Sequence, residues 1–279
     1  MSKGVLIFAQ NNTEIDYVKI AIFAAERVKQ YVCDSVCLIT DTGDYIKSFG
    51  EQAKVFEHVI NIDSGSLQNR QFYDGAMASK TLHWKNFSRS DCYDLSPYDE
   101  TLVIDSDFII NSNTLSNIWG SPEDFLIYEN GYDLAQWRGA NAYQYINQYS
   151  IPFYWATVFY FRKTEYTRSL FTIIKHIKDN WDYYRLVYSI ETSTFRNDYA
   201  FSIAIHLMNN QVKDNLQPVL PGKLFYTLDR DLLVKSIDQK MLFLIEKEKY
   251  HGEYTAVKTN GLDIHIMNKY SLARYIDEQ

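Results

Sequence analysis

Short apolar segments alternate with a segment of helical periodicity at the start of the chain, and this alternation constrains the fold most. Val5–Ala9 and Val36–Thr40 are strand-length runs of mostly apolar residues. Between them, apolar residues recur every three or four positions, which is typical of a helix that packs on one face. A strand, a helix and a strand at this spacing predict a right-handed crossover. We therefore expect an α/β protein with a mostly parallel sheet flanked by helices.

The later segments continue this pattern less regularly. Val55–Ile62 and Thr101–Ile104 are expected as further strands. Gln71–Leu95 is expected as a long helix that ends at Ser96-Pro97, because proline cannot continue a helix. In the second half we expect the strands Ala156–Phe161, Leu242–Ile245 and Leu262–Ile266, and helices at Glu165–Tyr184, 200–208 and Tyr270–Ile276. Since no repeat or Pro/Gly-rich linker divides the chain, we expect one domain over residues 1–279 with an elaborated second half.

The composition argues against several classes of protein. Twenty-eight Lys and Arg against 35 Asp and Glu leave a net charge of −7, which disfavours a protein that coats nucleic acid non-specifically. No apolar run reaches the roughly 18 residues of a membrane-spanning helix, and the N-terminus lacks the pattern of a signal peptide. Cys33, Cys37 and Cys92 form neither an even framework nor a Cys-x-x-Cys pair, which favours reduced thiols in a cytoplasm.

The strand expected at Thr101–Ile104 runs directly into two carboxylates, Asp105 and Asp107. In open parallel sheets the ligand crevice lies outside the carboxyl ends of the strands, so both side chains are expected at a binding site. Two neighbouring carboxylates repel each other, and a divalent cation keeps both ionised. We therefore expect Mg²⁺ or Mn²⁺ here, which can bridge to the phosphates of a substrate. A solvated acidic loop is the alternative.

A second polar group follows the late strand expected at Leu262–Ile266. His265 lies in this strand, and Lys269 follows it closely. His265 can complete the coordination shell of Mn²⁺, and Lys269 can neutralise a diphosphate. Taken alone, a histidine on a strand is more often a hydrogen-bonded structural residue. The metal interpretation depends on its pairing with Asp105 and Asp107.

Together these segments resemble the GT-A nucleotide-sugar glycosyltransferases. The shared features are a first strand with a polar loop, a buried strand that ends in Asp-x-Asp, and a C-terminal His followed by Lys. Leu95–Asp107 is similar to the retaining branch that includes glycogenin and bacterial lipooligosaccharide galactosyltransferases. It also resembles bacteriophage glycosyltransferases, including enzymes that add sugars such as arabinose to hydroxymethylated cytosine in phage DNA. The resemblance covers nearly the whole chain but departs at the C-terminus, where the branch has His-x-x-Gly-x-x-Lys and Lys269 follows His265 more closely.

The resemblance implies a metal-dependent transfer of a sugar from a nucleoside-diphosphate sugar, with UDP-sugar as the expected donor and Mn²⁺ or Mg²⁺ as the cofactor. Residues 1–112 would bind the donor, and residues 113–279 would bind the acceptor and supply the C-terminal metal and phosphate segment. The positions that it assigns to the donor are Ala9, Gln10, Asn11, Asp41, Lys85, Arg89, Asp105 and Lys269. The positions that it assigns to the metal are Asp105, Asp107 and His265.

The catalytic positions that the resemblance implies are Asp198 and Asn197, at the start of a helix. They match an acidic position that faces the transferred sugar and the acceptor. The alternative for Asp198 is a favourable charge at a helix N-terminus. No residue is a secure covalent nucleophile, so a retaining outcome rests on the resemblance alone.

Aromatic residues supply candidates for the acceptor side, in a chain that is 16% aromatic. Trp137, Arg138 and Trp155 lie between the metal strand and the next strand. The aromatic rings can stack on a sugar or on a flipped base, or they can simply pack beneath a long loop.

Basic residues supply a second set of candidates. Lys163, Arg168, Lys175 and Lys178 lie on or just before the helix expected from Glu165. They can follow a DNA backbone, or they can form an ordinary solvated helix face. A local basic surface would be compatible with the negative net charge of the whole chain.

The leading acceptor is 5-hydroxymethylcytosine in phage DNA, which would place the enzyme in the host cytoplasm, and a glycan or a protein is the second candidate. A non-catalytic nucleotide- or sugar-binding protein of the same fold is the competing class. A nucleotidyltransferase is disfavoured, because no glycine-rich phosphate loop follows the first strand.

Overall fold

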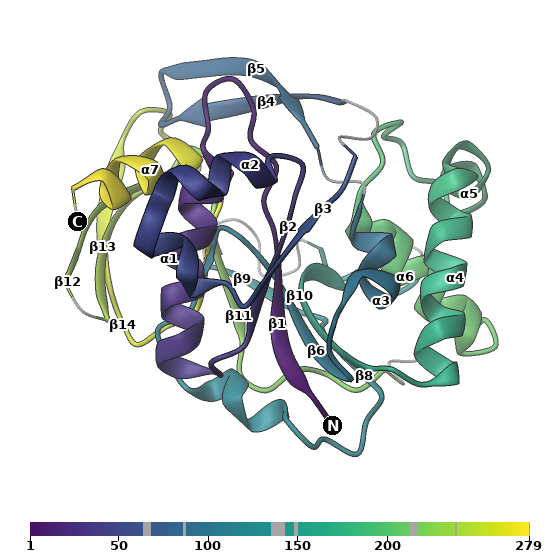
Figure 1. Cartoon of the computed structure of the whole chain (residues 1–279). Coiled ribbons are helices and arrows are strands. Elements are labelled where there is room, and N and C mark those ends of the chain that lie inside the picture. The colour runs from purple at the N-terminus through teal and green to yellow at the C-terminus, as the bar shows by residue number, and fades with distance from the viewer. Residues whose placement is uncertain are drawn as a thin grey trace.

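The central layer of the molecule is a six-stranded sheet in the order β3-β2-β1-β6-β10-β8 (Figure 1). The computed structural model describes residues 1–63, 68–85, 88–134, 143–147, 150–212, 217–237 and 239–278. The strands of this sheet are β1 (Lys3–Phe8), β2 (Val36–Thr40), β3 (His58–Asn61), β6 (Glu100–Asp105), β8 (Phe125–Tyr128) and β10 (Trp155–Arg162). The first four in the order are parallel, and β10 is antiparallel to both of its neighbours. The predicted α/β fold with a mostly parallel sheet is therefore confirmed.

The central strands are continuous apolar runs because helices or other strands cover them. Every residue of β2 is buried, and only the last residue of β6 reaches partial exposure. The helix α1 (Tyr17–Tyr31) packs on β1 and β2, whereas α6 (Asn197–Met208) packs on β10 and carries α4 (Glu165–Asp179) on its outer side. A strand buried in this way loses the alternation of polar and apolar residues. That explains why short apolar runs located these strands correctly.

Two smaller sheets complete the second half of the chain. The four-stranded sheet β7-β15-β11-β9 comprises β7 (Phe108–Ile109), β9 (Gly131–Asp133), β11 (Leu224–Thr227) and β15 (Ile264–Ile266). The three-stranded sheet comprises β12 (Leu232–Ile237), β13 (Lys240–Glu246) and β14 (Tyr254–Asn260). The last helix, α7 (Lys269–Asp277), contacts β12 and α1 and lies beside α1 in Figure 1.

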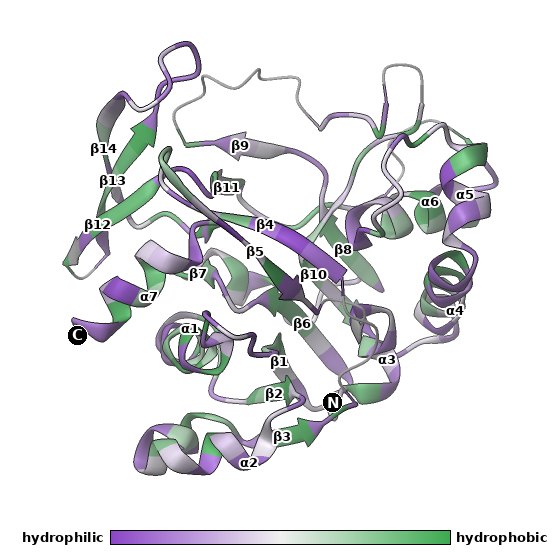
Figure 2. Cartoon of the chain, turned by 90° about the horizontal axis from the view of Figure 1, so that it is seen from above, coloured by the Kyte–Doolittle hydropathy of each residue, from purple (hydrophilic) through white to green (hydrophobic). Residues whose placement is uncertain are grey.

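The prediction of a long helix at Gln71–Leu95 is wrong. The structure has a hairpin of β4 (Gln68–Asp74) and β5 (Ala78–Trp84), followed by the short helices η2 (Ser88–Asp91) and α3 (Cys92–Leu95). Gly75, in the turn, has a φ of 72°, which a right-handed helix does not permit. The hairpin crosses the carboxyl ends of the parallel strands (Figures 1 and 2). Residues 71–84 thus cover the edge of the sheet where the expected site lies.

The other expected elements need smaller corrections. The expected strand Val55–Ile62 is shortened to β3, because the 3₁₀ helix η1 (Lys47–Val55) follows α2 (Gly43–Ile46) and occupies its start. The expected helix Glu165–Tyr184 is interrupted at Asn180, so that α5 (Trp181–Val187) is a separate helix, and η3 (Thr114–Ile118) was not expected. None of the helices in the described part of the chain is long and apolar enough to span a bilayer.

Candidate functional site

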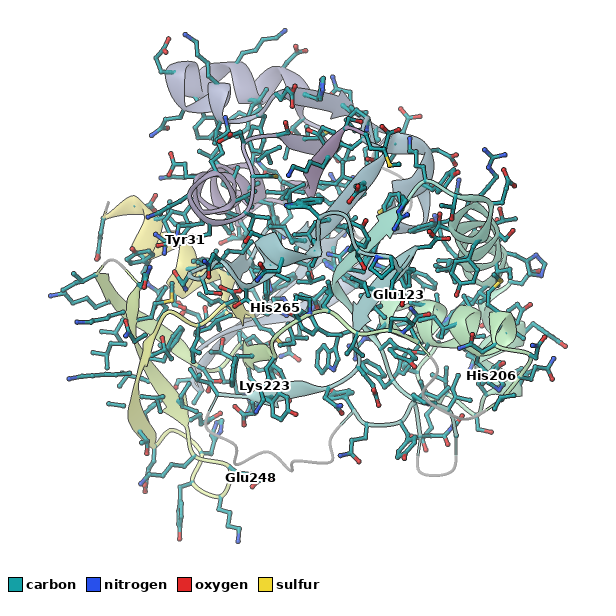
Figure 3. All side chains as sticks on the ribbon, turned by 90° about the horizontal axis from the view of Figure 1, so that it is seen from below. Tyr31, Glu123, His206, Lys223, Glu248 and His265 are labelled. Atoms are coloured by element: carbon teal, nitrogen blue, oxygen red, sulfur yellow. The ribbon has the colours of Figure 1, made fainter. Side chains whose placement is uncertain are left out.

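A cleft of about 470 Å³ opens at the carboxyl edge of the parallel sheet. Its walls come from the ends of β1 and β6, from the hairpin β4–β5, from β10, from the start of α6 and from the connection between β15 and α7. These segments are far apart in the sequence and converge because the strands that carry them end at the same edge. Figure 3 shows His265 in the interior of the molecule, surrounded by the side chains of several of these elements.

Three potential metal ligands converge on this cleft. Asp105, Asp107 and His265 each offer one ligand atom, and these atoms lie within 4.8 Å of one another. His265 Nε2 lies 3.1 Å from Asp107 Oδ2 and 3.8 Å from Asp105 Oδ2. The backbone explains the placement, because β15 pairs with β7 and the Ile266 N–H donates to the Asp107 carbonyl over 2.9 Å. The predicted pairing of His265 with the two aspartates is therefore present in the structure.

The donor set fits a divalent cation. Two carboxylates and an imidazole are suitable ligands for Mn²⁺, and the carboxylates alone suit Mg²⁺. Asp107 and His265 are 4% and 8% exposed, so an ion that binds them displaces little water from their side chains. These three residues would hold the ion, with the remaining ligands supplied by water and substrate, as is usual for Mg²⁺ sites that bind phosphates.

Two cations balance the aspartates. Lys269 Nζ forms an ion pair with Asp107, and the Arg89 guanidinium forms an ion pair with Asp105 and donates to the Ala156 carbonyl. Burial raises the pKa of Asp107, but the charges of Lys269 and His265 outweigh it and hold this pKa well below its usual range. Asp107 is therefore ionised at neutral pH, as a metal ligand must be.

Asp198 lines the same cleft as this group. Its Oδ1 accepts from the Ala156 N–H over 2.9 Å, and its Oδ2 accepts from Arg196 Nη2 over 2.7 Å. Ala156 therefore contacts both residues: its N–H donates to Asp198, and its carbonyl accepts from Arg89. Asn197 lines the cleft beside Asp198 and is buried. The carboxylate also lies in the first turn of α6, where negative charge is favourable.

Among the positions assigned to the nucleotide, Gln10 and Lys85 line the cleft. Gln10 Nε2 is buried and has no hydrogen-bond partner among the described residues. Lys85 Nζ lies 2.6 Å from Asp41 Oδ2, so Asp41 holds Lys85 in place rather than lining the cleft itself.

Ala9 and Asn11 form hydrogen bonds within the protein. The Ala9 N–H donates to the Ile39 carbonyl over 2.9 Å, which extends the pairing of β1 with β2. Asn11 Oδ1 accepts from the Val18 N–H over 2.9 Å. Neither residue is part of the cleft lining.

On the acceptor side, Trp155 lines the cleft and packs against two tyrosines. Its ring centroid lies 5.1 Å from that of Tyr226 and 5.4 Å from that of Tyr143. Its Nε1 is buried without a hydrogen-bond partner in the described part of the chain. Trp137 and Arg138 lie outside the described residues.

The basic residues of α4 contact other groups of the protein. Lys175 Nζ lies 3.1 Å from Asp91 and 2.5 Å from Asp94, and Arg168 lies 3.2 Å from Glu165. The ammonium groups of Lys163 and Lys178 donate to Ser96 O and Ser90 Oγ, respectively. These contacts favour the interpretation of an ordinary helix face over that of a stripe for a DNA backbone.

The sequence analysis missed the residues that the hairpin contributes to the cleft, above all Arg70 and Trp84. The signal that could have found them is Asp74-Gly75, a dipeptide typical of hairpin turns. It was overlooked because the flanking alanine, methionine, lysine and leucine favour helices.

No protein-family model matches the sequence, and no curated protein matches it. Solved structures are similar in fold. The glycosyltransferase GlyE of Streptococcus pneumoniae aligns with 78% of this chain at 9% identity and a TM-score of 0.43, and the alignment spans 45% of GlyE. The galactosyltransferase LgtC, solved with donor and acceptor sugar analogues, aligns with 72% of this chain and 70% of its own at 11% identity and a TM-score of 0.45.

A synthase is also among the similar structures. The 4-diphosphocytidyl-2C-methyl-D-erythritol synthase of Anaerococcus prevotii aligns with 80% of this chain and 89% of its own at 10% identity and a TM-score of 0.37.

Proposed function

We propose that the protein is a metal-dependent glycosyltransferase that moves a sugar from a nucleoside-diphosphate sugar, with UDP-sugar as the first candidate, to a hydroxyl acceptor. One observation carries this proposal. Asp105, Asp107 and His265 meet within 4.8 Å at the carboxyl edge of a parallel sheet, in a cleft that also holds Lys269 and Arg89. A site with a divalent cation and basic side chains suits a leaving group with several negative charges.

The roles of the residues follow from the charges. Cleavage of the bond between the sugar and the diphosphate leaves negative charge on the phosphate oxygens. When bound, Mn²⁺ or Mg²⁺ supplies positive charge to those oxygens. Lys269 Nζ, positioned at Asp107, donates to the same oxygens, and Arg89 fixes the orientation of Asp105.

On the other side of the cleft, Asp198 stabilises positive charge on the sugar carbon or orients the acceptor hydroxyl. Asn197 adjoins it in the cleft lining. The retaining outcome stays part of the proposal on the resemblance alone. Both Asp198 oxygens accept hydrogen bonds, which suits a role in electrostatic stabilisation.

The donor half of the proposal is tested by nucleotide binding and hydrolysis. We expect a nucleoside diphosphate to raise the melting temperature in the presence of Mn²⁺, and the matching nucleotide sugar to be hydrolysed slowly. Asp107→Asn keeps the size of the side chain but removes a charged ligand, and we expect it to lower the hydrolysis rate about 100-fold or more. The exposed Asp44→Asn, which makes the same chemical change at a residue that does not line the cleft, serves as control.

Two results would contradict the donor half. If wild type shows no shift with any nucleoside diphosphate, the donor site is wrong. If it binds nucleotides but neither hydrolyses nor transfers, the chain is a non-catalytic binding protein.

The acceptor is the less constrained half of the proposal. Trp155 and Tyr143 offer aromatic surface that suits a sugar ring, and 5-hydroxymethylcytosine in duplex DNA stays a candidate beside a glycan or a protein side chain. We propose a cytoplasmic enzyme, which agrees with three free cysteines in the described chain. Transfer from a radiolabelled nucleotide sugar to hydroxymethylated and unmodified duplex DNA, in parallel with an oligosaccharide panel, separates these acceptors. Label in both DNA samples alike would exclude the modified base as the acceptor.

A further inference from the structure

Arg70 is a cation of the cleft that no part of the sequence pattern singles out. It lies on β4 and lines the cleft from the side of the hairpin. The strand register places Arg70 opposite Leu82, on the same face of the hairpin as Phe72 and Trp84. Leu82 and Phe72 are buried, whereas most of the residues that alternate with them along the two strands are exposed. Arg70 therefore belongs to the inner face, which turns toward the protein.

The guanidinium is held between two aromatic rings. Its Cζ lies 5.3 Å from the ring centroid of Phe72 and 5.5 Å from that of Trp84. Such contacts fix the plane of the group, but they leave its N–H donors free for a ligand. A planar fork of donors is well suited to phosphate oxygens.

Within the part of the chain that the structure describes, no carboxylate pairs with Arg70. This sets it apart from Lys269, Arg89, Lys85 and Arg196, the other cations of the cleft, each of which pairs with an aspartate. A half-buried cation beside further cations is unfavourable unless an anion enters. The geometry thus leaves one positive charge of the cleft uncompensated.

A second group beside Arg70 also lacks a partner. The Tyr17 hydroxyl is buried, and it has no hydrogen-bond partner among the described residues. Tyr17 and Arg70 both line the cleft. Burial and the charge of Asp107 raise the pKa of Tyr17, and the charge of Arg70 opposes that shift. A neutral O–H and a guanidinium both donate hydrogen bonds to the oxygens of an anion.

We propose that Arg70 binds the diphosphate of the donor nucleotide from the hairpin side of the cleft, while Lys269 approaches it from the start of α7. This inference rests on the proposed function. Arg70 is then a specificity-determining residue, because its contact distinguishes a diphosphate from a ligand without phosphate.

The hairpin gives Arg70 a fixed position. Arg274 binds the Asp74 carboxylate with two hydrogen bonds of 2.7 and 2.8 Å, at the end of β4. In the turn, the Ala76 N–H donates to the Tyr254 hydroxyl over 2.8 Å. These contacts tie the hairpin to α7 and β14. An arginine on an anchored strand loses less conformational entropy on binding than one on a free loop.

Binding of nucleotides tests the role of Arg70. The affinities of UDP, GDP, CDP, ADP and dTDP are measured by titration calorimetry in Mn²⁺, and the diphosphate that wild type binds most tightly is carried forward. We expect Arg70→Met to weaken that affinity by about 10- to 100-fold, the usual effect of a lost charged hydrogen bond. Arg70→Lys keeps the charge without the fork, so we expect a smaller loss. Lys80→Met removes a positive charge from an exposed position of the same hairpin, where Lys80 pairs with Glu14. Because Lys80 does not line the cleft, this change should leave the affinity unchanged.

A second measurement separates phosphate binding from damage to the fold. The affinity for Mn²⁺ alone, followed by electron paramagnetic resonance, should be the same in Arg70→Met as in wild type. An unchanged diphosphate affinity in Arg70→Met would overturn the inference, and so would an equal loss of Mn²⁺ affinity. If wild type binds none of the five diphosphates, the proposed function fails first and the inference with it. If wild type binds and Arg70→Met binds equally, the inference alone fails.

Discussion

Lys269 and Asp107 form a buried ion pair at the centre of the cleft, with each side chain only 6% exposed. Removal of one partner from such a pair leaves the other as an uncompensated buried charge. The resemblance of the sequence to one family implied that both residues belong to one donor site, although they follow strands of different sheets. It could not indicate that Arg89 pairs with Asp105, since that contact depends on how the hairpin and η2 fold back onto β10.

We expect Lys269→Met to lower the free energy of unfolding by about 3 kcal/mol in the absence of divalent cations. The double variant Asp107→Asn/Lys269→Met should cost less than the sum of the single variants, because no unpaired charge remains. Because the pKa of Asp107 is low in the folded protein, the ion pair stabilises the fold above about pH 3.9, the usual pKa of aspartate. This stabilisation is lost as the pH falls from that value toward the lower pKa of the folded protein. Urea unfolding from pH 3 to pH 7 should therefore give a flatter curve for Lys269→Met. Parallel curves for the two proteins would contradict the role of the pair.

The pairing of β7 with β15 brings His265 close to Asp105 and Asp107. Asp263, just before β15, accepts hydrogen bonds from the N–H groups of Asn111 and Ser112 over 2.7 and 2.9 Å, and from Ser112 Oγ over 3.0 Å. The strand β15 was predicted from its apolar run. Its partner β7 was not, because two residues give no periodicity, and the hairpin was missed because its composition favours a helix.

We expect Asp263→Ala to lower the free energy of unfolding by about 1–3 kcal/mol, since it leaves two buried N–H groups without an acceptor. It should also weaken Mn²⁺ binding, because β15 then holds His265 less firmly beside Asp107. Urea unfolding and Mn²⁺ titration check the two effects, with Asp277→Ala as a control at an exposed acid that pairs with Lys19. A loss of stability with unchanged Mn²⁺ affinity would show that β15 is positioned by other contacts.

At the scale of the whole molecule, the site is formed by segments that are far apart in the sequence. Asp105 and Asp107 belong to the end of the central sheet, whereas His265 and Lys269 belong to the small sheet and the last helix. The sequence established the α/β layers, because buried strands and amphipathic helices have local signatures. It could not establish the arrangement of the small four-stranded sheet, which includes pairing between residues more than 100 positions apart, such as Phe108 with His265.

An ion bound by residues of both parts should therefore stabilise the whole fold. Binding to the native state alone adds free energy according to the ligand concentration, about 2.7 kcal/mol at 100 times the dissociation constant. We expect this gain when Mn²⁺ replaces EDTA in urea unfolding of wild type, and a much smaller gain in Asp107→Asn. Asp44→Asn should gain as much as wild type, because its carboxylate is exposed and does not line the cleft. An equal gain in Asp107→Asn would mean that Mn²⁺ binds elsewhere, and then the group of Asp105, Asp107 and His265 is not the metal site that the proposed sugar transfer requires.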